Sequence, residues 1–152
     1  MKKGSVTRLT LVPLAGKEEE SAFNISVQAN EEKVSQSLGS IHEYLSNAGV
    51  GKKLTHDIAL CIEELLLNIV HHAGRNMQSH YIDVHIHMRE GQMLASVKDD
   101  GRAFDPVHFD IEKRQAGLKL LNGLCPHIDY QYMYGQNMTF MKWDRQQQTE
   151  NN

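Results

Sequence analysis

The segment from Asp57 to Gly74, DIALCIEELLLNIVHHAG, is the strongest constraint that this sequence places on its fold. Its apolar residues recur at the spacing of a largely buried helix, yet Glu64, Asn68 and His72 interrupt it at intervals of four. Residues four apart lie on one face of an α-helix, about one turn from each other. The three polar residues therefore form one stripe, and the apolar residues predicted to face the interior are Ile58, Cys61, Ile62, Leu65 and Ile69.

Polar residues at this spacing have two interpretations. They can form a solvated face, which is the commoner arrangement for a helix on a protein surface. They can also line a cleft, where a carboxylate such as Glu64 orients or deprotonates a hydroxyl. In a cleft the amide oxygen of Asn68 is a suitable neutral ligand for Mg²⁺ that arrives on a triphosphate. The stripe alone leaves both interpretations open.

Periodicity predicts two kinds of element along the remainder of the chain. Alternating apolar and polar residues predict strands over 5–14, 22–29, 81–90, 92–100, 128–134 and 137–143. Helical spacing predicts helices over 31–48 with Asn30 as N-cap and Gly49 behind it, over 57–73 with Thr55 as cap, and over 116–125. The tyrosines at 130, 132 and 134 fit strand packing better than a platform for stacking bases.

The predicted order is β-β-α-α-β-β-loop-α-β-β. Strands in adjacent pairs indicate a mainly antiparallel, mixed sheet, and the helices are left to cover one face of it. The fold class is therefore α+β, a two-layer α/β sandwich. A chain of 152 residues is the right size for one domain, predicted over 1–145, with a disordered polar tail over 146–152.

Composition argues against several classes of function. The formal net charge is −3, so no excess of basic residues favours a nucleic-acid partner. No uninterrupted apolar run is long enough to span a bilayer. Cys61 and Cys125 are the only cysteines, and both are predicted to be buried, unpaired side chains in a reducing compartment. We therefore expect a cytoplasmic protein that neither spans a membrane nor binds nucleic acid.

Two further motifs follow the polar helix. In VKDDGRAFDP, Asp99 ends a predicted strand, where a carboxylate can accept a hydrogen bond from an exocyclic amine, and Gly101 lets the backbone pass close to a flat ring. In QAGLKLLNGLC, Gly117 opens a helix whose free amide groups suit a phosphate. Taken alone, the first is more often an acidic turn, and a glycine near a helix end is common.

The three motifs together, in this order, resemble the ATP-binding domains of gyrase, heat-shock chaperones, mismatch-repair proteins and histidine kinases. The sequence is most similar to the anti-sigma-factor serine kinase branch, whose boxes match ELLLNIVHHA, DDGRAFDP and AGLKLL. The resemblance implies ATP and Mg²⁺ as cofactors, Glu64 as the general base toward a serine of a partner protein, and Asn68 as the Mg²⁺ ligand. The nucleotide-binding residues that it implies are Asn68, His72, Asp99, Gly101, Phe104, Gly117, Leu118 and Asn137.

Departures from the family pattern define the alternatives. The link from Phe104 to Gly117 is shorter than the usual glycine-rich lid, Gln115 replaces its first glycine, and Asn137 stands where many relatives carry threonine. A module that has kept the fold for protein binding and lost phosphoryl transfer is therefore the second hypothesis. The catalytic domain of a histidine kinase is the third. Relatives commonly dimerise, so the resemblance also allows a homodimer. His85 and His87 share a strand face and suggest a zinc or nickel site as a minor possibility.

Overall fold

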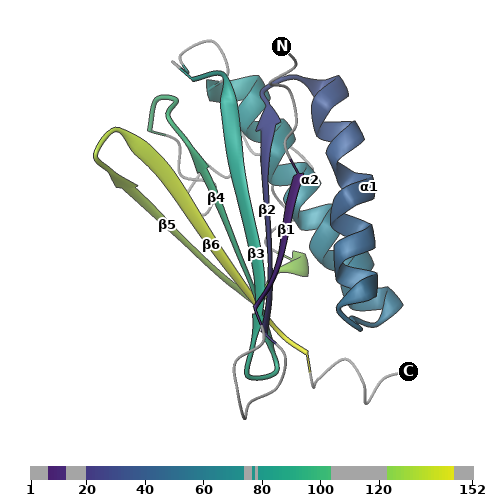
Figure 1. Ribbon diagram of the computed structural model, residues 1–152. Coiled ribbons are helices and arrows are strands. Elements are labelled where there is room, and N and C mark those ends of the chain that lie inside the picture. Colours follow the sequence, from purple (N-terminus) through teal and green to yellow (C-terminus); the bar gives the residue numbers. More distant parts are fainter. Residues whose placement is uncertain (1–6, 13–19, 74–76, 78, 104–122, 146–152) are drawn as a thin grey trace.

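The computed structural model describes residues 7–12, 20–73, 77, 79–103 and 123–145. The strands form one sheet in the order β1-β2-β3-β4-β6-β5, and every pairing among them is antiparallel. The helices lie side by side on one face of this sheet (Figure 1). The elements are β1 (Thr7–Val12), β2 (Glu20–Gln28), α1 (Glu31–Asn47), α2 (Lys52–Ala73), β3 (Tyr81–Arg89), β4 (Gln92–Asp99), β5 (His127–Met133) and β6 (Gln136–Asp144).

The predicted fold class is confirmed: the described part of the chain is a two-layer α+β sandwich with helices on one face of the sheet. Each of the six predicted strands is present, and each observed end lies within two residues of the predicted one. Most of the predicted helix over 116–125 lies outside the described residues, and so does the predicted tail over 146–152. Neither described helix combines the length and the apolarity that a bilayer span requires.

The start of α2 differs from the prediction. The helix begins at Lys52, and Thr55, predicted as its cap, lies within the first turn. The Thr55 N–H donates to the carbonyl of Gly51 at 2.9 Å, and its hydroxyl donates to the carbonyl of Val50 at 3.3 Å. Gly49 adopts a φ of +80°, which turns the chain sharply enough for the second helix to start at once. The Thr55 cap prediction was therefore wrong by about one turn.

Local chemistry explains the other element ends. The Asn30 side chain accepts a hydrogen bond from the Lys33 N–H at 2.8 Å, which confirms it as the N-cap of α1. The β3–β4 hairpin turns at Glu90 and Gly91, with φ of 50° and 77°. A second pair, at 134 and 135, has φ of 55° and 75° and joins β5 to β6. Two-residue turns of this left-handed kind match the twist of the flanking strands and fix their register.

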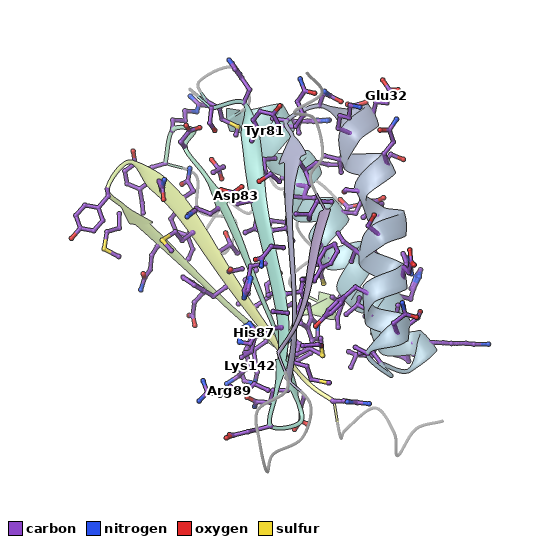
Figure 2. All side chains as sticks on the ribbon, in the orientation of Figure 1. Glu32, Tyr81, Asp83, His87, Arg89 and Lys142 are labelled. Carbon is purple, nitrogen blue, oxygen red and sulfur yellow. The ribbon has the colours of Figure 1, made fainter. Side chains whose placement is uncertain are left out.

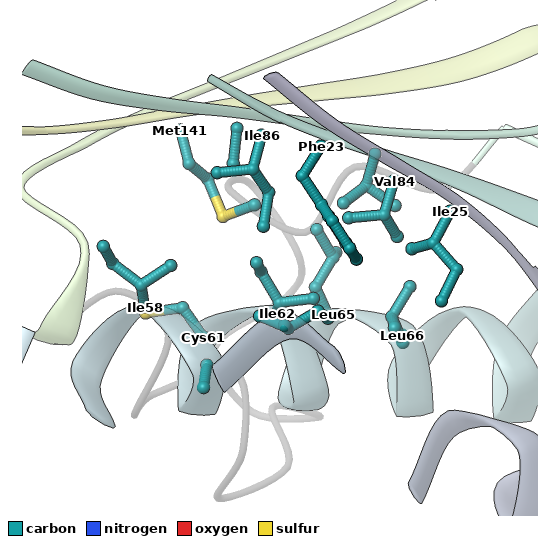
Figure 3. Packing of buried hydrophobic residues seen from close by; sticks show 14 of the residues in the cluster. Phe23, Ile25, Ile58, Cys61, Ile62, Leu65, Leu66, Val84, Ile86 and Met141 are labelled. Atoms are coloured by element: carbon teal, nitrogen blue, oxygen red, sulfur yellow. The ribbon is translucent and has the colours of Figure 1, made fainter. Parts of the chain in front are cut away.

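The core lies between α2 and the sheet. In Figure 3, Ile62 and Leu65 of α2 face Phe23 and Ile86 of the sheet, and all four side chains are at most 2% exposed. The predicted interior face of α2 is confirmed, since its five apolar residues are 0 to 4% exposed. Burying such a side chain contributes roughly 1.5–3 kcal/mol of transfer free energy, so this face fixes the rotation of the helix.

Both cysteines belong to this core. Cys61 is 0% exposed and Cys125 is 3% exposed, and both are free thiols. Burial raises the pKa of Cys61 to about 12 and that of Cys125 to about 11. Thiols with such a pKa are protonated at neutral pH and react slowly, because the thiolate is the nucleophile. Their predicted role as small buried side chains is confirmed.

The two faces of the sheet differ in chemistry. Figure 2 shows Asp83, His87 and Arg89 following one another along β3, while Glu32 projects from the outer side of the helix layer. Asp83 accepts a hydrogen bond from the Ser26 hydroxyl at 2.6 Å on the face away from the helices. On the helix-facing side, buried residues alternate along β4 and end with Asp99. A carboxylate therefore closes an otherwise apolar row.

We expect the substitution Ile62→Ala to destabilise the protein by about 2–5 kcal/mol, because it leaves a cavity in a packed core. Urea unfolding followed by circular dichroism measures this change. Phe140→Ala is the matched control, since Phe140 is 38% exposed and should lose about 1 kcal/mol or less. Equal losses for the two variants would show that α2 and the sheet do not form the main core.

Candidate functional site

Two chain segments that carry predicted site residues end at the same place. α2 ends at Ala73, shortly before β3 begins at Tyr81, and β4 runs antiparallel to β3. The last residue of β4, Asp99, therefore lies at the end of the sheet where β3 begins (Figure 1). The N–H of Ser79, in the α2–β3 connection, donates to Asp100 Oδ2 at 2.9 Å and joins the two segments.

The polar stripe of α2 is only partly exposed to solvent. Asn68 is only 4% exposed, and Glu64 and His72 are partly buried. The Asn68 Nδ2 donates to the backbone carbonyl of Glu64 at 2.6 Å. That bond fixes the amide so that the donor end points along its own helix and the oxygen, Oδ1, is presented away from it. A buried amide oxygen held in this way can coordinate a hard cation.

Burial also changes the acid–base properties of Glu64. Desolvation, and secondly the charge of neighbouring Glu63, raise the pKa of Glu64 above its ordinary value. Both effects disfavour the charged carboxylate. A raised pKa lies closer to the pKa that an effective general base has at neutral pH. Glu63 itself lies about 100° further round the helix.

His72 lies in the last turn of α2, and its surroundings change its acid–base properties. Its pKa is lowered, first by burial, then by the charge of His71 and then by that of Arg102. Arg102 belongs to the turn that follows Asp99. A lowered pKa keeps the His72 imidazole neutral at physiological pH.

Asp99 is the buried carboxylate of this region, at 5% exposure. Its Oδ1 accepts hydrogen bonds from the Gly101 N–H at 2.9 Å and from Asn137 Nδ2 at 3.0 Å. Desolvation raises the pKa of Asp99 most strongly, these two hydrogen bonds lower it, and the charge of Asp100 raises it. Both bonds end on Oδ1, so within the described residues Oδ2 is the carboxylate oxygen that can accept a further hydrogen bond.

Asn137 lies opposite Asp99 in the register of β4 and β6 and is 3% exposed. Besides Asp99, its Nδ2 contacts the carbonyl oxygens of Gly101 at 3.2 Å and Arg102 at 2.9 Å. Its Oδ1 accepts a hydrogen bond from the Tyr130 hydroxyl. The sequence predicted Asn137 near the base but assigned Tyr130 to packing alone. Only the strand register brings that hydroxyl to the site, so no sequence signal could have identified it.

The remaining predicted residues are not placed. Phe104, Gly117 and Leu118 lie outside the described residues, as does Gln115. A polar hollow of about 710 Å³ lies beside the described site and is lined by the turn 100–102 and the hairpin residues Tyr132, Tyr134, Gly135 and Gln136. Of the predicted nucleotide-binding residues, Gly101 lines this hollow, whereas Asn68 and Asp99 do not.

The histidine pair is a separate feature on the open face. His85 Nδ1 is hydrogen-bonded to Asn24 Oδ1, and the ring centroids of His85 and His87 are 5.1 Å apart. Within the described residues, no group of three or more His, Cys, Asp or Glu side chains is arranged to hold a metal ion. Within the described residues, no third side chain therefore joins His85 and His87 to complete a metal site.

Comparisons with known proteins identify similar sequences. A model of the histidine kinase-like ATPase domain matches residues 27–143 of the chain. The sequence is 25% identical over 144 residues to the serine-protein kinase RsbW of Listeria innocua serovar 6a, covering 86% of this chain and 92% of the relative. These matches confirm the predicted resemblance.

Solved structures share the fold. The structure of the RsbU and RsbW domains of Rv1364c from Mycobacterium tuberculosis aligns with a TM-score of 0.60 at 18% identity, covering 80% of this chain and 32% of that chain. The chain thus spans about a third of the mycobacterial structure. A chain of the SiaB–SiaC complex from Pseudomonas aeruginosa aligns with a TM-score of 0.52 at 13% identity, covering 78% of this chain and 87% of that chain. A histidine kinase domain from Erythrobacter litoralis aligns with a TM-score of 0.54 at 15% identity, covering 82% of this chain and 64% of that chain.

We expect Asp99→Asn to raise the thermal unfolding midpoint at pH 7. Burial raises the pKa of Asp99 in the folded state above its ordinary value of 3.8, which we take for the unfolded chain. The ionised carboxylate therefore begins to destabilise the folded state when the pH rises above 3.8, and the full loss of stability is reached above the folded-state pKa. The amide keeps an oxygen for the Gly101 and Asn137 donors and carries no charge.

Thermal melts of the unchanged protein and of Asp99→Asn between pH 3 and pH 8 measure the difference in unfolding midpoint. This difference should vanish at the acid end of the range. Asp129→Asn, at an exposed strand position, is the matched control and should shift the midpoint little. A lower midpoint for Asp99→Asn at pH 7 would mean that the hydrogen bonds to the carboxylate outweigh its desolvation.

Proposed function

Because the chain belongs to the histidine kinase-like ATPase domain family, we propose that it binds ATP with Mg²⁺ and phosphorylates a serine of a small regulatory partner protein. The observation that carries this proposal is a pair of buried acceptors, Asn68 and Asp99, on segments that end at the same end of the sheet. The similarity to a serine-protein kinase supports serine as the acceptor in preference to histidine.

The described side chains fit magnesium–ATP. The Asn68 amide has its donor end occupied by the carbonyl of Glu64, so its oxygen is the atom offered to a cation. The Asp99 carboxylate has Oδ1 occupied by two donors and can take the adenine amine on Oδ2. Gly101 is buried in the turn after Asp99, where the lack of a side chain allows a flat ring to approach.

Each residue then has a distinct task. Asp99 binds and orients the adenine, and Asn137 supports that carboxylate. Asn68 holds the cation, which when bound neutralises charge on the transferring phosphoryl group. Glu64, with a raised pKa, accepts the proton of the serine hydroxyl. Positioning and charge neutralisation supply most of the catalysis in phosphoryl transfer, so the rigidity of α2 is part of the mechanism.

A protein partner is supported by two of the similar proteins. One is a serine-protein kinase and another is part of the SiaB–SiaC complex. The net charge of −3 gives no reason to prefer a nucleic-acid partner.

Asn68→Ala should abolish the part of nucleotide binding that depends on Mg²⁺. We expect the affinity for ATP in the presence of Mg²⁺ to fall roughly tenfold or more, while the affinity for AMP is unchanged. Isothermal titration calorimetry with and without Mg²⁺ measures both. Asn24→Ala, on the opposite face of the sheet beside His85, is the matched control. Equal losses for AMP and magnesium–ATP would contradict the role of Asn68, and no heat with millimolar ATP for the unchanged protein would contradict nucleotide binding itself.

Glu64→Gln should remove catalysis and keep nucleotide binding. Loss of a general base typically lowers the rate by about 10²–10⁴-fold. Transfer of radiolabelled phosphate from ATP to a co-purified partner measures the rate, and Glu63→Gln, on a different side of the same helix, should retain it. If Glu64→Gln left regulation of the partner intact, the chain would act as a protein-binding module that has lost phosphoryl transfer.

A further inference from the structure

The large apolar side chains that the described residues leave in solvent gather on one hairpin. Tyr132, Met133, Tyr134 and Phe140 are 38 to 95% exposed, and all four belong to β5, β6 or the turn between them. Figure 1 shows this turn at the far left, on the opposite side of the molecule from α1. Exposed apolar groups concentrated in one place are typical of an interaction surface.

Tyr134 is an unfavourable residue for the turn that it occupies. Tyr134 and Gly135 have φ of 55° and 75°, and Glu90 and Gly91 form an equivalent turn between β3 and β4 with φ of 50° and 77°. The first position of such a turn favours Asn, Asp or Gly, because a left-handed backbone strains other residues. A tyrosine that is 95% exposed gains little from packing in return. A residue that breaks a local rule without a gain for the fold is expected at a functional site.

A hollow with charged walls borders the aromatic turn. Its volume is about 710 Å³, and it is lined by Tyr132 and Tyr134 of the hairpin and by Asp100, Gly101 and Arg102 of the turn after β4. Arg102 is exposed, and the two ion pairs found among the described residues do not include it. A carboxylate is the natural counter-ion for a guanidinium in this position. Tyrosine, methionine and arginine are also the residue types that are enriched in protein–protein interfaces.

We infer that Tyr132, Met133, Tyr134 and Arg102 form a docking surface for a protein that offers an apolar pocket bordered by carboxylates. The pocket receives the Tyr134 ring, and a carboxylate pairs with Arg102. An anionic membrane or a nucleic acid fits less well, because Asp100 lines the same hollow and the chain carries a net charge of −3. The occupant is the serine-bearing partner, because the hollow borders the proposed nucleotide site, so the inference rests on the proposed function.

The first test concerns the fold alone. Tyr134→Asn introduces a residue that this turn favours, so the thermal unfolding midpoint should rise by about 1–3 °C. Glu90→Asn makes the same change in the equivalent turn between β3 and β4 and is the matched control. A fall in the midpoint for Tyr134→Asn would show that the tyrosine stabilises the hairpin, and it would overturn the inference.

The second test measures binding of the partner by calorimetry without nucleotide, so that the result does not depend on phosphoryl transfer. The probe is the co-purified partner, expressed and purified separately. We expect Tyr134→Asn to weaken binding roughly 10- to 30-fold, as for an aromatic anchor of an interface, and Glu90→Asn to leave it unchanged. Arg102→Gln should weaken binding mainly at low salt, because salt screens an exposed ion pair. Equal affinities for the unchanged protein and Tyr134→Asn would contradict the docking surface.

Two further measurements separate other occupants. Sedimentation velocity detects a second copy of the chain, and flotation with vesicles of phosphatidylcholine and phosphatidylglycerol detects a membrane. Loss of self-association or of vesicle binding in Tyr134→Asn would assign the surface to one of these and overturn the inference. If the unchanged protein binds the partner and transfers no phosphate to it, the proposed catalysis fails while the docking surface stands, so the two failures are distinguishable.

Discussion

The packing of one face of α2 against the sheet is the constraint on which the site depends. Ile62 and Leu65 are almost completely buried beneath the strands, and they cannot be rotated away without opening a cavity. Because successive side chains of an α-helix are rotated by a fixed angle of about 100°, fixing these side chains also fixes the direction of Glu64 and Asn68. The hydrophobic core thus fixes the direction of the polar stripe, and the rigidity that the proposed phosphoryl transfer requires comes from the same contacts that stabilise the fold.

The site itself is maintained at a cost to stability. Asp99 and Asn137 are buried polar side chains at the edge of an apolar interior, and each is held by hydrogen bonds that offset part of its desolvation. The carboxylate nevertheless keeps a raised pKa, which means that the folded protein disfavours its charge. A neutral residue would suit the fold better at neutral pH, and the proposed adenine contact offers a functional reason to keep the acid.

The first predicted motif and the first part of the second, up to residue 103, lie in the described part of the chain. The turn after β4 is joined to the α2–β3 connection by the Ser79–Asp100 hydrogen bond, and Arg102 influences His72 electrostatically. The third motif, with Gly117, lies outside the described residues together with Gln115. The roles assigned to those two residues therefore remain predictions.

The sequence by itself determined the elements, their order and the polar stripe of α2, because hydrophobic periodicity, caps and left-handed turn positions act over a few neighbouring residues. It missed the true start of α2, since a cap at Thr55 and a turn completed at Gly49 compete, and only the packed chain decides between them. Only the tertiary structure decided that Tyr130 contacts Asn137 and that Asn137 contacts Asp99. That contact depends on the register between strands distant in sequence, which no local pattern encodes.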